Sequence, residues 1–114
     1  MARSDFTMVT FNHSFNAASP SETRNFSVEG NPVRDGYLLV QAFDVERNSH
    51  EIAINGQRLP GFDLPRDGNN EWQTWMEQIP HGFLNSGQNR ITIRRRGNDD
   101  FRVAKVVIHW RETS

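Results

Sequence analysis

Hydrophobic and polar residues alternate along most of the chain with a period of two. No apolar stripe with helical spacing persists over three turns. A period of two places apolar side chains on one face of a β-strand. The pattern therefore predicts an all-β chain, with candidate strands at residues 6–15, 25–29, 37–44, 51–55, 72–79, 89–96 and 101–110.

Short segments rich in Gly, Pro, Asn, Asp and Ser separate these candidate strands. Asn55-Gly56 is the clearest of them, because Asn-Gly suits the two positive φ angles of a type I′ hairpin turn. Residues 15–25 are the most polar stretch, and we expect them to form a mobile loop. Seven or eight strands at this spacing indicate a sandwich or a barrel. We expect residues 1–114 to form a single domain.

Strand parity predicts which side chains form the core. We expect these residues to be buried: Val40, Ile52, Ile54, Trp75, Leu84, Ile91, Ile93, Val106 and Ile108. In the last strand, Ala104, Val106, Ile108 and Trp110 share the predicted inner face, and Val103, Lys105, Val107 and His109 the outer one. Tyr37, Leu39, Gln41 and Phe43 make the outer face of their strand unusually aromatic. Either a second layer covers that face or something binds there.

Composition excludes several classes of protein. The chain has no cysteine, so it has neither disulfides nor thiolate metal sites nor cysteine catalysis. Its net charge of −1 gives no global field toward nucleic acid or an anionic membrane, and we expect neither partner. The N-terminus lacks the apolar segment of a signal peptide, and no run approaches the length of a membrane span. These features favour a cytoplasmic location.

Few residues suggest catalysis or metal binding. The histidines at positions 13, 50, 81 and 109 are scattered singly, so we expect no transition-metal site. The loop at residues 97–100 offers three oxygen-bearing side chains, too few for calcium, and a hairpin turn explains it better. Asp44 and Glu46 near His50 are interpreted as solvated charges. Without a nucleophile or paired carboxylates, we expect no catalytic residue and no cofactor.

The tryptophans are more informative. Trp72 and Trp75 lie three residues apart, so they project to opposite faces of a strand. Trp75 shares parity with Ile79 and is predicted to be buried, whereas Trp72 is predicted to be partly exposed. An exposed indole suits stacking on a sugar ring. The alternative is that Trp72 packs beneath the loop at residues 65–70.

Two short sequence motifs carry a family resemblance. "EIAINGQRLPGF" contributes Ile52, Ile54, Asn55, Gly56, Leu59 and Gly61, and "IPHGFLNSGQNRITI" contributes Ile79, Pro80, Phe83, Leu84, Gly87, Asn89, Ile91 and Ile93. With them, residues 35–110 resemble the galactose-binding-domain-like jelly-roll superfamily, in particular the sugar-binding-type domains appended to many glycoside hydrolases. The resemblance implies an antiparallel jelly-roll β-sandwich of about eight strands.

Two hypotheses for function follow. The first is a non-catalytic, carbohydrate-binding module. Its candidate ligand-binding residues point away from the predicted core: Trp72, Tyr37, Gln41, Arg94 and His109. The second is a protein-interaction or structural module, for example a homo-oligomer, in which a partner covers the face with Leu39, Phe43, Val103 and Val107.

Overall fold

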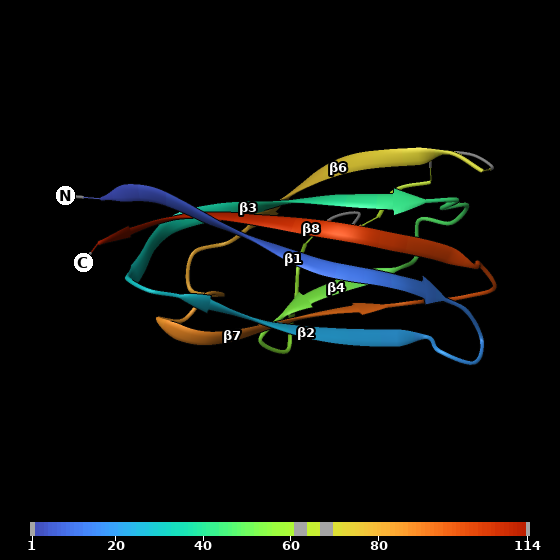
Figure 1. Cartoon of the computed structure of the whole chain (residues 1–114), viewed down its shortest axis with the longest axis horizontal. Helices are drawn as coiled ribbons and strands as arrows, with labels where there is room; N and C mark the ends of the chain where they lie inside the picture. Colours follow the sequence, from blue (N-terminus) through green and yellow to red (C-terminus); the bar gives the residue numbers. More distant parts are fainter. Residues whose placement is uncertain (1, 61–63, 67–69, 114) are drawn as a thin grey trace.

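The computed structural model describes residues 2–60, 64–66 and 70–113 (Figure 1). Within these ranges the chain forms strands and no helix, which confirms the all-β prediction. The strands are β1 (Arg3–Phe15), β2 (Ser21–Val28), β3 (Asn31–Phe43), β4 (Glu51–Ile54), β5 (Gln57–Arg58), β6 (Trp72–Ile79), β7 (Gly87–Arg94) and β8 (Phe101–Thr113). No helix long and apolar enough to cross a membrane occurs in the part of the chain described.

The strands form two antiparallel sheets that pack face to face (Figure 1). Sheet A has the order β1-β8-β3-β6, and sheet B has the order β2-β7-β4-β5. Except at the β4–β5 hairpin, each connection crosses from one sheet to the other. This arrangement confirms the predicted jelly-roll sandwich. It also means that neighbours along the sequence usually lie on opposite sides of the molecule.

The predicted loop at residues 15–25 is wrong in extent. β2 begins at Ser21, and residues 21–25 pair with β7 from Ser21↔Arg94 to Asn25↔Arg90. Alternate side chains of β2 lie on the outer face of sheet B and face solvent. A polar sequence is compatible with such a strand, because backbone groups make the ladder hydrogen bonds. The connection itself spans only residues 16–20.

The core lies between the sheets and contains every predicted core residue except Trp75. Trp75 is 38% exposed, so the prediction that it is buried is wrong. Trp75 pairs with the buried Val40, and its position in the alternation directs its side chain toward the core, but β6 is an edge strand of sheet A. One flank of the indole therefore has no neighbouring strand in the sheet. Trp72, predicted to be partly exposed, is 51% exposed.

A β-bulge in β8 changes which residues face the core. Val103 is fully buried and Ala104 is partly exposed, the reverse of the prediction from strict alternation. Against β3, Gln41 pairs with Lys105 and Ala42 with Val103, so one step on β3 matches two on β8. An extra residue of this kind shifts the alternation of inward and outward side chains by one position. Beyond the bulge, Val106, Ile108 and Trp110 are buried as predicted.

The predicted Asn55-Gly56 turn is confirmed, whereas the hairpin turn predicted at residues 97–100 is wrong, because that segment joins β7 of sheet B to β8 of sheet A. Asn55 and Gly56 have φ angles of 52° and 82°, as a type I′ turn requires. Gly87 also has a positive φ, and the Phe83 N–H donates to the Pro80 carbonyl to close a single turn. Asn89 bonds to the backbone of Asn85 and Gly87. Gly61 of the first sequence motif lies outside the described residues.

Candidate ligand-binding groove

The structure places four of the five predicted ligand-binding residues on the outer face of sheet A. Tyr37 and His109 pair across β3 and β8, and their rings stack at 4.6 Å with an interplanar angle of 8°. Trp72 lies beside Phe43 at the far end of β3, with ring centroids 5.1 Å apart. Phe43 lies six positions along β3 from Tyr37, which is about 20 Å of strand. One sugar ring therefore cannot contact both Tyr37 and Trp72.

Arg94, the fifth predicted residue, lies on the opposite side of the molecule. It belongs to β7 in sheet B, whereas Tyr37, Gln41, Trp72 and His109 all lie on strands of sheet A. The five residues therefore do not form one site. Two separate surfaces remain: the mostly apolar outer face of sheet A, and the polar outer face of sheet B around Arg94.

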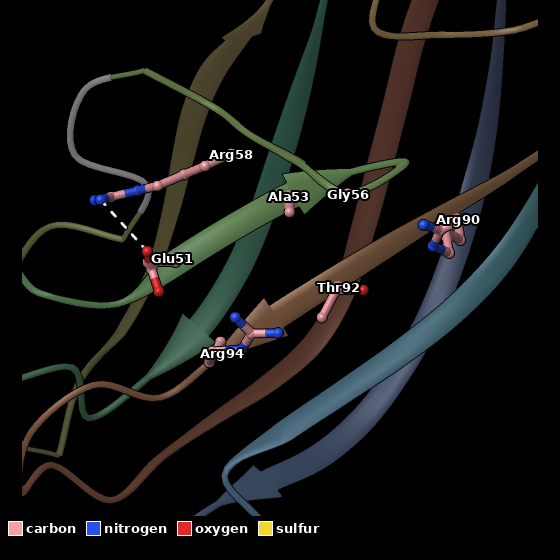
Figure 2. A pocket seen from close by; sticks show the side chains of 7 residues that line it. All are labelled: Glu51, Ala53, Gly56, Arg58, Arg90, Thr92 and Arg94. Carbon is pink, nitrogen blue, oxygen red and sulfur yellow. Dashed lines mark ion pairs between the residues drawn. The ribbon is translucent and has the colours of Figure 1, made fainter.

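The outer face of sheet B is hollowed into a groove of about 250 Å³ (Figure 2). The groove is lined by Glu51, Ala53, Gly56, Arg58, Arg90, Thr92 and Arg94. On β7, Arg90, Thr92 and Arg94 alternate with the buried Ile91 and Ile93. The period of two that builds the core thus also aims these three side chains outward.

Strand pairing sets the shape of this groove. Thr92 lies opposite Ala53, which in turn lies opposite Arg58, so small side chains form the floor. Arg94 lies opposite Glu51 at one end of the floor, and Arg90 stands at the other end beside the hairpin turn (Figure 2). Long side chains therefore surround a floor of short ones.

Gly56 has a second role beyond its turn geometry. A Cβ built on Gly56 would lie 3.3 Å from the Arg90 guanidinium, so the missing side chain leaves room for Arg90. Next to the floor, the Thr92 and Thr23 hydroxyls are hydrogen-bonded at 2.8 Å. This contact holds the Thr92 side chain in a defined orientation.

The groove is electropositive, with three guanidinium groups and one carboxylate in its lining. Glu51 forms an ion pair with Arg58 at 3.4 Å and another with Arg96. The hydrogen bond from Arg96 lowers the pKa of Glu51, and the charges of Arg96, Arg58 and Arg94 act in the same direction. Among the described residues, the guanidinium groups of Arg90 and Arg94 form neither a hydrogen bond nor an ion pair.

Two free guanidinium groups beside a shallow polar floor suit an anionic ligand. Each guanidinium presents a planar fork of donors that matches a carboxylate, sulfate or phosphate. No aromatic ring lines the groove, so stacking does not contribute there. Of the arginines in the groove, the sequence indicated only Arg94 as a candidate ligand-binding residue. Ala53 and Arg58 come from strands whose partners are fixed by the fold, so the groove has no signature in the linear sequence.

A buried pair, His50 and Asp99, lies near one end of the sandwich. The His50 Nε2 is 2.7 Å from Asp99 Oδ2, and both side chains are buried. His50 Nδ1 accepts the Arg96 backbone N–H at 3.1 Å, and burial lowers the pKa of His50. Asp99 Oδ2 also accepts the backbone N–H groups of Glu46 and Arg47. The pair therefore ties two loops together rather than opening onto the groove.

Solved structures share this fold. A family 35 carbohydrate-binding module from an environmental isolate superposes with a TM-score of 0.58 and 18% identity, over 77% of this chain and 64% of that chain. The CBM35 from Paenibacillus barcinonensis gives 0.61 and 14%, over 95% and 97%. A β-porphyranase of glycoside hydrolase family 86 from the human gut bacterium Bacteroides plebeius gives 0.55 and 13%, over 96% of this chain but 21% of that one.

These likenesses confirm the jelly-roll fold that the two sequence motifs predicted. At such low identity they establish the fold alone. No curated protein matches the chain in sequence. A family model matches it over residues 3–112, nearly its whole length. The chain therefore belongs to the family of unknown function DUF7383.

Proposed function

We propose that the chain is a non-catalytic carbohydrate-binding module that holds an acidic glycan in the arginine groove. The observation that carries this proposal is the pair Arg90 and Arg94, whose guanidinium groups are unpaired and stand at the two ends of the Thr92–Ala53 floor. Such groups bind a carboxylate or sulfate through charge-assisted hydrogen bonds, which are about twice as strong as neutral ones.

The spacing of the two arginines favours a chain over a monosaccharide. Arg90 and Arg94 lie four residues apart on one strand, which separates their Cα atoms by about 13 Å. A ligand that reaches both guanidinium groups carries at least two anionic groups along its length. Thr92 and Thr23 lie between them and offer hydroxyl groups for the sugar hydroxyls.

The chemistry of the groove supports binding without catalysis. Glycoside hydrolysis generally uses two carboxyl groups, one of which stays protonated to act as an acid. The lining of the groove contains one carboxyl group, Glu51, whose ion pairs with Arg58 and Arg96 favour its ionised form. The carbohydrate-binding modules that share the fold provide further support for a glycan ligand.

Affinity electrophoresis tests the proposal with a pair of matched polysaccharides. Polygalacturonate carries a carboxylate on each sugar, and its fully methyl-esterified form has the same backbone without the charge. We expect retardation by the acid form only. Arg90→Gln and Arg94→Gln should each weaken binding about tenfold, the equivalent of about 1.4 kcal/mol for a lost charged hydrogen bond. Arg111→Gln, an exposed arginine outside the groove, is the matched control and should bind like wild type.

Two further ligands test which kind of anionic group the groove binds. Dextran sulfate tests whether sulfate replaces carboxylate, since both fit the guanidinium fork. A single-stranded oligonucleotide tests phosphate, and tighter binding to it than to either polysaccharide would assign the groove to nucleic acid and contradict the proposal. Equal retardation by polygalacturonate and its methyl ester, or equal loss in all three variants, would also contradict it.

A further inference from the structure

The outer face of sheet A exposes large apolar side chains on three of its four strands, β1, β3 and β6. Phe6 and Met8 on β1 are 63% and 56% exposed, and Met76 on β6 is 60% exposed. Tyr37 on β3 is also exposed, and Leu39 and Val107 are half-buried between Met8 and Met76. A contiguous apolar surface of this kind on a protein marks an interaction site.

Strand pairing arranges these side chains in rows across the sheet. The central row is apolar and consists of Met8, Val107, Leu39 and Met76. On one side lies an aromatic row of Phe6, His109, Tyr37 and Gln78, in which His109 stacks on both Phe6 and Tyr37. On the other side lies a polar row of Thr10, Lys105, Gln41 and Thr74. None of these twelve residues is acidic.

The face is large enough for a stable interface. At about 4.8 Å spacing and about 43 Å in length, β1, β8 and β3 cover about 620 Å², and the eight residues of β6 add about 130 Å². The total of about 750 Å² is close to the roughly 800 Å² that each partner buries in an interface of standard size. β1, β3 and β8 each contain thirteen residues, and β1, β8, β3 and β6 lie side by side (Figure 1).

We propose that a second copy of this chain covers the outer face of sheet A, packing face to face about a twofold axis that runs along the central row. The alternative is a twofold axis that runs parallel to the strands, between β8 and β3. Projected onto the plane of the face, the two copies of Lys105 would then lie within about 5 Å of each other. The axis along the central row separates them by about 13 Å, more than the Debye length of about 10 Å at 0.1 M salt.

This axis also makes the three rows complementary, although one row further out it brings Arg111 toward the partner's Arg102. Each residue of the central row meets its own copy, so apolar side chains bury apolar side chains. The aromatic row of one copy meets the polar row of the other, which brings Lys105 over the stacked rings of the partner's Tyr37 and the partner's His109. An ammonium group over an aromatic face is attracted by the ring quadrupole.

The dimer leaves the arginine grooves free. Sheet A of each copy lies inside the dimer, so both copies of sheet B face outward on opposite sides. A dimer with two outward grooves binds a polymeric ligand with increased avidity, because the second contact is intramolecular. The proposed dimer interface involves sheet A alone, so the variants Arg90→Gln and Arg94→Gln do not test dimerisation.

Sedimentation velocity measures the association directly. We expect a species of twice 13.2 kDa whose population rises with concentration. Met76→Lys places a charge on the central row and should weaken dimerisation at least tenfold, roughly the effect of losing one apolar anchor. Gln88→Lys adds the same charge at an exposed position of β7 on sheet B and should leave the dimer intact. Circular dichroism checks that both variants keep the β-sheet spectrum.

A chain that stays at 13.2 kDa up to about 1 mM, the weak limit of specific affinity, overturns the proposal. A dimer that both variants retain overturns the assignment to this face. The dependence of dimerisation on salt concentration is a second measurement. Salt screens the repulsion between like-charged copies, so dimerisation through apolar side chains should stay the same or strengthen as salt rises. A dimer that dissociates in salt contradicts the proposal.

The chain has no cysteine, so one introduced thiol reports the arrangement of the copies. Met76→Cys lies on the proposed axis and should cross-link to its own copy through a short bis-maleimide. Gln88→Cys on sheet B is the control and should not cross-link. A dimer in which Met76→Cys fails to cross-link overturns the axis along the central row.

Discussion

Acidification between pH 7.5 and 5.5 should destabilise this protein through His50. The imidazole is fully buried, and its Nδ1 accepts the Arg96 N–H at 3.1 Å, so that nitrogen carries no proton. Burial is the main cause that lowers the pKa of His50 below its ordinary value of 6.5, although the hydrogen bond to Asp99 acts in the opposite direction. Protonation would break the Arg96 hydrogen bond and place a charge in the interior.

The sign and the magnitude follow from proton linkage. The unfolded state binds the proton near pH 6.5 and the folded state only at lower pH, so the free energy of unfolding falls as pH drops through that window. The slope approaches about 1.4 kcal/mol per pH unit, so the loss by pH 5.5 is at most about 1.4 kcal/mol. For a chain of 114 residues this lowers Tm by at most about 5 °C. Glu22, Glu51 and Glu112, whose pKa values are lowered from 4.5, titrate below this window.

Urea unfolding at pH 5.5, 6.5 and 7.5 measures this slope. His50→Gln removes the titrating group, so its stability should vary less with pH whatever its stability at pH 7.5. His81→Gln, at an exposed histidine, is the matched control and should keep the wild-type slope. An unchanged slope in His50→Gln, or greater stability of the wild type at pH 5.5 than at 7.5, would refute the reasoning.

Two further predictions concern stability. Ile108→Ala removes a fully buried side chain and should cost about 2–5 kcal/mol in urea unfolding, whereas Val107→Ala, half-buried on the outer face, should cost less than about 1 kcal/mol. Similar losses in both would mean that the faces of β8 are assigned wrongly. Asn89→Ala removes a buried amide that bonds to Asn55, Asn85 and Gly87 and should cost about 2–4 kcal/mol by leaving these groups unpaired. An Asn89 loss below about 1 kcal/mol, in the range of surface substitutions, would contradict that role.

The sequence by itself determined the features that depend on a few neighbouring residues. Alternation along Asn89–Arg94 identified Ile91 and Ile93 as core, because successive side chains of a strand point to opposite faces. The Asn55-Gly56 pair predicted the hairpin, because these residues tolerate the positive φ angles that its turn requires.

The tertiary structure decided everything that depends on which strands become neighbours. The bulge in β8 buries Val103 because Ala42 and Gln41 on β3 fix the register, and the exposure of Trp75 follows from the place of β6 at the sheet edge. His50 lies 49 residues from Asp99 along the chain. Arg94 and Tyr37 share outward parity, yet alternate strands enter different sheets, so they lie on opposite faces of the sandwich. Parity gives a side chain's direction within its own strand, but only the pairing of distant strands determines which surface that side chain joins.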